Sequence, residues 1–390
     1  MNGYGKLPIL AADVSGALAI LYGFAGLRIV CSAGSCGNNY VKFDEFRPAP
    51  EKNLYTTRMG MLHAVSGEEH VLEAIQNTDL GTEISFLALV GTSVPSIAGM
   101  ELSAAAKRIE RETGIPTVYV ACDGFHSAGD GAAKLLRELG TRVGRKRKTR
   151  PKSVNLIGYD PLLHGDEKEL APLREWIREQ RIQIACDWSA AKTLSDLEES
   201  AAAALNLVLS GSGLPLAEYM AEKFAIPYEL VCPCGRTGLH QLTRIFGRYF
   251  QTPLESRLQE KPPQGNSPWR AVVLGEPVWA EGMKHLLVHE LGIRDVQKFC
   301  YEEAAFSPAV RQRLPDARYE KISSLPKRLE ELTSPCLVLG DPLFRRFVRE
   351  GVRFIDFPDR RLSGSLFLAS PWLGEKGSEY LSTTIYERSL

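Results

Sequence analysis

Short apolar runs alternate with amphipathic segments along most of the chain. Eight runs are dominated by aliphatic and aromatic residues and lack the polar alternation of a half-exposed strand. Continuous runs of this length are typical of parallel strands that are covered on both faces. They lie at residues 27–30, 84–90, 117–121, 154–157, 205–209, 228–231, 271–274 and 336–339.

Helical segments lie between the predicted strands. Their apolar residues recur three or four positions apart, which is the period of an amphipathic helix. Alternating strands and helices indicate βαβ units, and therefore an α/β fold with doubly wound parallel sheets. The clearest helices are predicted at residues 101–113, 129–139, 167–180, 215–224 and 279–291.

Two polar, proline-containing stretches without periodicity interrupt this pattern, at residues 144–153 and 259–268. A chain of 390 residues is too long for one ordinary hydrophobic core. Each of the three parts that the stretches separate contains several βα units. We therefore expect domains at residues 1–145, joined by the C-terminal segment 360–390, at residues 152–260 and at residues 268–360.

Composition narrows the function classes. The chain has no formal net charge, which argues against a general affinity for nucleic acid or for membrane surfaces. No apolar run reaches the roughly 18 residues that span a bilayer. Eight cysteines are too sparse for a disulfide scaffold. We therefore expect a cytoplasmic protein with neither a nucleic-acid nor a membrane partner.

The loop Cys31-Ser-Ala-Gly-Ser-Cys36 follows the first predicted strand directly. Two soft thiol ligands stand close together there, with only small side chains between them. In a reducing compartment such thiols are more often metal ligands or reactive groups than disulfide partners. The sequence therefore predicts a metal site at Cys31 and Cys36.

A second pair of thiols lies in the loop Val231-Cys-Pro-Cys-Gly-Arg236, which follows a strand and opens a helix. The start of a helix lowers the pKa of a thiol and favours anions. Cys232 and Cys234 could ligate a metal, react or line a pocket, and Arg236 could bind a carboxylate or phosphate. We take the three residues as candidate cofactor-binding residues.

His126 lies on a predicted strand-to-helix loop and is the candidate catalytic residue. Histidine titrates near neutral pH, so it can donate protons during a reduction. A loop histidine that caps a helix is the alternative.

Two further features have a structural and a functional interpretation. Three βα turns, at residues 157–161, 274–277 and 339–342, each place an acidic residue before a proline. They are either helix caps or ligand-binding turns at sheet edges. The basic run at residues 145–148 either docks an acidic partner or is a solvated linker.

The order and spacing of these motifs resemble the component 1 family of nitrogenase-like oxidoreductases. That family includes nitrogenase subunits, cofactor-assembly scaffolds, dark-operative protochlorophyllide reductases and a tetrapyrrole reductive cyclase. The similarity extends over nearly the whole chain. The segments that carry it are residues 16–37, 55–57, 66–75, 91–102, 124–131, 204–208 and 220–227.

The resemblance implies three Rossmann-like domains around a central cleft, and the pairing of two subunits. It also implies a [4Fe-4S] or larger cluster between the subunits, which an ATP-hydrolysing iron–sulfur reductase supplies with electrons. A small-molecule or tetrapyrrole-like substrate would lie in the cleft. ATP would be used only by the partner reductase, because this chain lacks the glycine-rich phosphate-binding loop with its lysine.

The chain departs from the family at the cluster cysteines. Of the three usual positions, Ala12 and Val94 occupy two, and only Cys36 is retained. Cys31 stands where many relatives have histidine. An iron–sulfur cluster generally needs four thiolates, and a two-fold pair of chains would offer four. Alternatively, Cys36 is a remnant and Cys31 a small buried residue, or a different subunit completes the site.

The expected function is therefore an oxidoreductase component that accepts low-potential electrons through an interfacial iron–sulfur cluster and reduces a substrate in the cleft. The partner subunit is a second copy or a homologous component 1 chain. Two alternatives stay open: a non-catalytic scaffold for assembly of a metallocofactor or tetrapyrrole, and a binding subunit that has lost its cluster.

Overall fold

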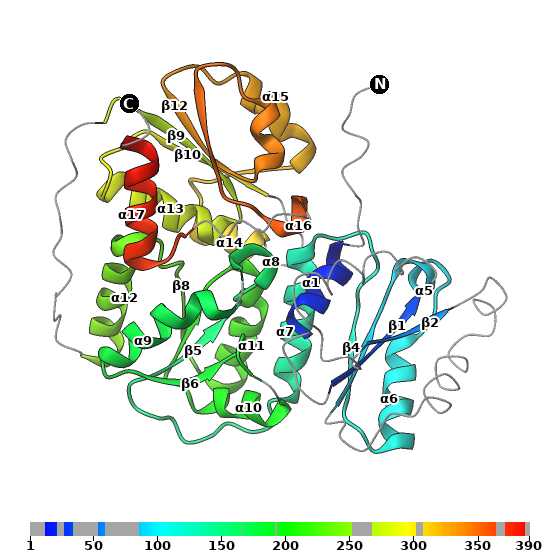
Figure 1. The fold of residues 1–390 in the computed structure, drawn as a ribbon. Helices are drawn as coiled ribbons and strands as arrows, with labels where there is room; N and C mark the ends of the chain where they lie inside the picture. The colour runs from blue at the N-terminus through cyan, green and yellow to red at the C-terminus, as the bar shows by residue number, and fades with distance from the viewer. Residues whose placement is uncertain are drawn as a thin grey trace.

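The described part of the chain contains three parallel β-sheets with helices packed around them (Figure 1). The computed structural model describes residues 12–21, 27–33, 54–58, 86–165, 167–191, 193–251, 267–301, 307–363 and 371–386. Every strand pair within the three sheets is parallel. The predicted α/β fold with parallel sheets is thereby confirmed.

The first sheet has the strand order β2-β1-β3-β4. Its central strand β3 reads Phe-Leu-Ala-Leu-Val and is buried along its whole length, as a strand with helices on both faces must be. The elements of this part are β1 Leu27–Ala33, β2 Leu54–Arg58, β3 Phe86–Val90, β4 Thr117–Val120, α1 Ala12–Leu21, α5 Ser93–Ile97, α6 Leu102–Thr113 and α7 Ala128–Arg142.

The second sheet repeats that order as β6-β5-β7-β8. Its strands are β5 Ser153–Ile157, β6 Gln183–Asp187, β7 Leu205–Val208 and β8 Tyr228–Leu230. Its helices are α8 Pro161–His164, α9 Ala171–Glu179, α10 Leu194–Glu198, α11 Leu214–Phe224 and α12 Gly235–Phe250, with 3₁₀ turns η2 Glu167–Leu170, η3 Glu199–Ala202 and η4 Gly211–Gly213.

The third sheet has the order β11-β10-β9-β12-β13, in which the strand order reverses between β9 and β12. Such a reversal opens a crevice at the carboxyl ends of the two strands, where α/β proteins bind ligands. The strands are β9 Arg270–Gly275, β10 Val296–Tyr301, β11 Arg318–Glu320, β12 Cys336–Gly340 and β13 Val352–Asp356. The other elements are α13 Pro277–His289, α14 Ser307–Arg313, η5 Ile322–Ser324, α15 Leu325–Glu330, η6 Pro342–Phe347, α16 Arg360–Ser363 and α17 Gly374–Tyr386.

Helices α1 and α7 pack so closely that neither tolerates a side chain at the contact. A Cβ atom added to Gly16 would lie 1.8 Å from the carbonyl oxygen of Ala128, and one on Gly131 would lie 1.7 Å from that of Asp13. Figure 1 shows α1 against α7, between the first sheet and the rest of the molecule. The two glycines therefore determine where the start of α1 lies.

The hydrophobic cores continue from one sheet to the next. One core joins α1, β3 and α7 to α11 of the second sheet through residues such as Leu139 and Leu216. Another joins the second and third sheets and includes Leu381 and Ile385 of α17. Helix α17 packs against α12, and α16 contacts α1 and α8 (Figure 1). The proposed division into three domains, including the assignment of 360–390, stays a prediction.

The first predicted junction makes specific contacts within the chain. The backbone N–H of Arg150 donates to the carbonyl of Ala202, and the Arg150 side chain pairs with Glu199. Arg147, which belongs to the basic run, pairs with both Glu198 and Glu199. This junction is thus held against α10 and η3 of the second sheet. The second junction, 259–268, lies mostly outside the described residues.

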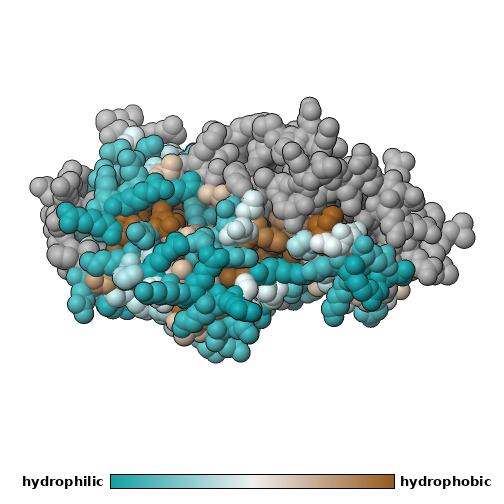
Figure 2. Space-filling model, turned by 90° about the horizontal axis from the view of Figure 1, so that it is seen from below, coloured by the Kyte–Doolittle hydropathy of each residue, from teal (hydrophilic) through white to brown (hydrophobic). Residues whose placement is uncertain are grey.

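Over the described ranges, no helix is both long and apolar enough to cross a bilayer. Figure 2 shows one face of the molecule, where hydrophilic side chains dominate and hydrophobic ones lie mainly in recesses between them.

Candidate functional site

A buried carboxylate organises the carboxyl edge of the first sheet. Asp13 lies in the first turn of α1 and is fully buried. Its Oδ2 accepts a hydrogen bond from the backbone N–H of Asp123 at 2.9 Å, and its Oδ1 accepts one from the N–H of Gly124 at 3.0 Å. Lys134 Nζ lies 3.9 Å from Oδ2. Asp13 therefore fixes the loop that follows β4.

The same loop positions His126. Asp123 Oδ1 accepts a hydrogen bond from Phe125 N–H at 2.9 Å and lies 2.8 Å from His126 Nδ1. The imidazole is 39% exposed, and Ser127, the next residue, forms a capping box with Asp130 at the start of α7. The helix is therefore capped by Ser127, and His126 is held by a carboxylate with its other nitrogen directed away from Asp123.

The two carboxyl groups have opposite pKa shifts. Burial raises the pKa of Asp13 above its ordinary value, although hydrogen bonds and Lys134 act against it. Burial also acts to raise the pKa of Asp123, but the bonds from Phe125 and His126, with the charge of Lys134, outweigh it and lower the pKa. Asp123 is therefore the ionised partner of His126.

The predicted metal ligands, Cys31 and Cys36, belong to β1 and to the segment that follows it. The backbone of Cys31 lies in β1, in register with Val90 at the end of β3 and with Thr56 of β2. Cys36 lies outside the described residues. Ala12 begins α1 and Val94 lies in α5, and the assignment of these two residues to the family's other cysteine positions stays a prediction. The strand that contains Cys31 therefore ends at the same edge of the sheet as the loop that holds His126.

The second pair of thiols is deeply buried. The Sγ atoms of Cys232 and Cys234 lie 3.7 Å apart, and Cys234 Sγ lies 3.9 Å from the carbonyl oxygen of Trp279. Gly282 of α13 leaves room for them, since a Cβ atom there would lie 2.9 Å from Cys234 Sγ. Burial raises the pKa of Cys232 well above its usual range. Reactivity or metal binding at this pair stays a prediction.

Arg236 is engaged with neighbouring helices. Its backbone N–H donates to Ser378 Oγ of α17 at 2.9 Å, and its guanidinium lies 3.5 Å from Glu290 Oε2. Glu290 also accepts a bond from Thr237 N–H. In the described structure Arg236 joins α12 to the end of α13 and to α17, and its anion-binding role stays a prediction.

All three acidic βα turns cap helices. Asp160, Glu276 and Asp341 accept bonds from the backbone N–H groups of Leu162, Trp279 and Leu343, each with a proline in the first turn. The capping interpretation is confirmed.

The turns also converge on one buried arginine. Arg361 forms an ion pair with Asp359, and its guanidinium lies 3.9 Å from the carboxyl group of Asp160. The backbone N–H of Asp359 donates to Asp341. Glu276 reaches across to the second sheet and accepts the N–H of Gly211. The carboxyl ends of β5, β9 and β12 thus share one polar cluster.

Burial controls the charges in this cluster. It raises the pKa values of Asp160 and Glu276, against the lowering effect of Arg361. It lowers the pKa of His164, at the end of α8, to about 3, and Arg361 adds to the shift. His164 is therefore neutral at physiological pH.

Two large apolar side chains are exposed near the carboxyl edge of the first sheet. Ile97, at the end of α5, is 75% exposed, and Phe125, beside His126, is 67% exposed. The two segments are neighbours, because a Cβ atom on Gly124 would lie 3.1 Å from Cβ of Ser93 in α5. Apolar side chains this exposed often mark an interaction surface.

His126 was identifiable from the sequence, but Asp123, which holds it, and Asp13 and Lys134, which contact the same loop, were missed. The available signal was an aspartate at the start of a helix and another directly after a strand. The hydrogen bond between Asp123 and Asp13 joins residues 110 positions apart, and no local sequence pattern reveals it.

Comparison with known proteins agrees with this architecture. The family model described as nitrogenase component 1 type oxidoreductase matches residues 13–265. The chain is 21% identical over 358 residues to a subunit of the light-independent protochlorophyllide reductase of Synechocystis sp., covering 82% of this chain and 70% of that protein. It is 23% identical over 244 residues to the nitrogenase molybdenum-iron protein alpha chain of Azospirillum brasilense, covering 57% of this chain and 50% of that one.

A solved structure shares the fold. Nitrogenase Cp1 at pH 6.5 superposes with a TM-score of 0.71 over 97% of this chain and 92% of its own, at 14% identity. The resemblance seen in the sequence motifs is confirmed, since the family model covers well over half of the chain. The chain belongs to the nitrogenase component 1 type oxidoreductases.

Proposed function

We propose that this chain is the substrate-reducing component of a nitrogenase-like system. The observation that carries the proposal is the series of polar groups at the carboxyl edge of the first sheet. There an exposed imidazole, His126, is held by Asp123, whose backbone is held by the buried Asp13. A reduction needs a supply of both electrons and protons at one place, and this edge combines a proton-carrying side chain with the strand of Cys31.

The donor set fits an iron–sulfur cluster shared between two chains. Thiolates are the ligands that such clusters use, and one chain offers Cys31 and Cys36 where four are needed. A second copy, or a homologous chain with equivalent cysteines, would complete a [4Fe-4S] site at the pairing face. When bound, the cluster would supply single electrons at low potential.

His126 would deliver the protons. Its Nδ1–H donates to the ionised Asp123, so Nε2 is the nitrogen that gains and loses a proton. Lys134 donates to the carbonyl of Ala121, and its Nζ lies 3.9 Å from Asp13 Oδ2. We infer that Asp123 orients the imidazole, while Nε2 protonates the substrate as it is reduced.

The proposed partners follow from the family. An ATP-dependent iron–sulfur reductase would supply the electrons and alone use ATP. The substrate would be a small or tetrapyrrole-like molecule in the cleft between the sheets, and the complex would work in the cytoplasm. The similarity to a light-independent protochlorophyllide reductase supports a tetrapyrrole-like substrate.

A second candidate function is a non-catalytic assembly scaffold, or a binding subunit without a cluster. Ala12 and Val94 at two of the three usual cysteine positions favour it.

Anaerobic purification separates the two candidates. Iron and sulfide are measured per chain, together with visible absorption, after reconstitution with iron and sulfide. A bridging cluster requires about two irons per chain, and Cys36→Ala should abolish the absorption. Cys232→Ala should retain it, and Cys186→Ala, at a buried thiol of the second sheet, is the matched control. Iron-free, colourless protein after reconstitution would overturn the shared cluster.

A further inference from the structure

Two imidazoles lie side by side on the surface of α13. His285 and His289 are four positions apart, a spacing that places both side chains on the same face of a helix. The His285 side chain is 36% exposed, and His289 is exposed. A pair of histidines at this spacing can bind one metal ion between them.

The separation of the two rings suits a shared ion. Their centroids lie 5.6 Å apart, and their planes differ by 22°. Two nitrogens that each lie about 2.1 Å from one ion are roughly 3–4 Å from each other. Small rotations of the His285 and His289 side chains, with no movement of the helix, bring the nitrogens to that separation.

A carboxylate orients the first imidazole. Glu281 lies one turn earlier on α13, and its Oε1 is 3.0 Å from His285 Nε2. Burial acts to raise the pKa of Glu281, but the bonds from His285 and Lys298 outweigh it and lower the pKa. In the neutral imidazole Nε2–H donates to this ionised carboxylate, so Nδ1 keeps its lone pair. Histidines that bind metals are commonly held by a carboxylate in this way.

The surrounding charges do not repel a cation. Lys284 pairs with Asp316, and the buried Lys298 pairs with both Glu281 and Asp316. These two lysines and two carboxylates are formally neutral together. His289 is the last residue of α13, and the C-terminal end of a helix favours positive charge.

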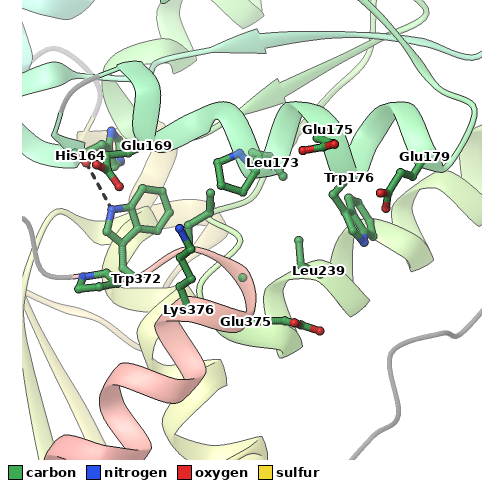
Figure 3. Close-up of a pocket in the computed structure, with 14 residues that line it drawn as sticks. His164, Glu169, Leu173, Glu175, Trp176, Glu179, Leu239, Trp372, Glu375 and Lys376 are labelled. Carbon is green, nitrogen blue, oxygen red and sulfur yellow. Dashed lines mark hydrogen bonds between the residues drawn. The ribbon is translucent and has the colours of Figure 1, made fainter.

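Carboxylates gather at a different place, around a cavity of about 490 Å³ between α9, the start of α12 and residues 371–376 (Figure 3). They belong to Glu169, Glu175, Glu179 and Glu375. Carboxylate oxygens suit calcium and magnesium, whereas imidazole nitrogens suit zinc, nickel and copper. An ion that prefers nitrogen therefore distinguishes α13 from this acidic surface.

We propose that His285 and His289 together bind a divalent metal ion of the zinc, nickel or copper class. His285 Nδ1 and a nitrogen of His289 are the protein ligands, Glu281 orients His285, and water completes the coordination. The ion fixes the last turn of α13, next to Glu290, which accepts the backbone N–H of Thr237 at the start of α12. This site goes beyond the proposed reduction and uses none of its residues.

A nickel titration of the full chain tests the site. Ni²⁺ is added to the iron-reconstituted chain at about pH 7.5 and is followed by calorimetry and ultraviolet absorption. Binding at α13 should appear without the thiolate-to-metal charge-transfer absorption that cysteine ligands give. At about pH 5.5, below the ordinary imidazole pKa of about 6.5, protons compete for the nitrogens, and the affinity should fall about tenfold or more. No binding up to about 1 mM would overturn the proposal.

Variants locate the ion. His285→Ala and His289→Ala should each weaken Ni²⁺ binding about tenfold or more, because a single imidazole loses the advantage of two linked ligands. Glu281→Gln keeps the size of the side chain but removes its charge, and it should weaken binding about tenfold.

Two controls exclude other positions. His240→Gln, in α12, which contains no second histidine, should leave the affinity unchanged. So should the double change Glu175→Gln with Glu179→Gln at the acidic surface. If the variants of His285 and His289 bind as the unaltered chain does, or if the glutamate variant alone loses binding, the ion lies elsewhere and the site is wrong. Iron content measured on the same samples distinguishes this result from a failure of the proposed cluster.

Discussion

Single buried charges show how this chain controls protonation. Lys298, in β10, is 1% exposed at its side chain and pairs with Glu281 of α13 and with Asp316. Burial acts to lower its pKa, but the two carboxylates outweigh burial and raise it. An unpaired charge at this depth would cost several kcal/mol, so the pairing keeps the lysine ionised.

Acid should remove part of this stabilisation. Burial acts to raise the pKa of Asp316, but Lys284 and Lys298 outweigh it and lower the pKa to about 2. A lowered carboxyl pKa gives stability that is complete above the unfolded value of about 4 and is lost as the pH falls toward 2. In urea unfolding between about pH 5 and pH 2.5, Asp316→Asn should therefore lose less stability than the unaltered chain. Parallel losses in the two proteins would contradict this account.

Helices and strands were predictable where local pattern and tertiary packing agree. The apolar runs became β1, β3, β4, β5, β7, β8, β9 and β12, and six of these eight strands lie in the interior of a sheet. β2, β6, β10, β11 and β13 were missed, since polar residues are interspersed in them and four of the five lie at sheet edges. The buried Lys298 in β10 is the clearest case, because its partners come from distant segments.

The residues of the candidate site also fall into two classes, those that local sequence rules predict and those that depend on the folded chain. His126 and the caps Asp160, Glu276 and Asp341 follow local rules and were identifiable from the sequence. The role of Asp13 depends on α1 crossing α7, which no periodicity encodes. The cluster around Arg361 likewise needs segments that meet only in the folded chain.

The α1–α7 crossing can be tested at one glycine. Gly131→Ala would place a methyl group against the carbonyl oxygen of Asp13, at 1.7 Å, and must push the helices apart. We expect a loss of about 1–3 kcal/mol, despite the better helix propensity of alanine. Gly144→Ala is the control, because a Cβ atom there meets nothing within 4 Å. Urea unfolding compares them, and equal midpoints would show that the crossing is not tightly packed.

At the scale of the whole molecule, we propose that the carboxyl edge of the first sheet is the face through which two chains pair. It exposes Ile97 and Phe125 close to the edge where the strand of Cys31 leads. A shared cluster and an apolar pairing face on one edge are mutually consistent, because a cluster between two chains must lie where they meet.

Pairing should be sensitive to charge at this face. If two copies pair, sedimentation should give twice the 43.1 kDa of one chain, and Phe125→Glu should shift the protein toward the single chain. Thr141→Glu, at the opposite end of α7, should leave the mass unchanged. A heterologous partner is indicated instead if the unaltered chain sediments as a monomer that Phe125→Glu does not alter.

The contact between α12 and the C-terminal segment has a consequence for synthesis on the ribosome. Gly235 N–H donates to the carbonyl of Trp372, and Arg236 N–H donates to Ser378, 142 residues later in the chain. At about 5–20 residues per second, the later side of this contact emerges roughly 7–28 s after the earlier one. Until then the start of α12 lacks the part of its cover that the C-terminal segment provides. If the second sheet forms before residue 372 has emerged, the nascent chain exposes the apolar face of α12 that α17 later covers, and a holding chaperone would find that surface.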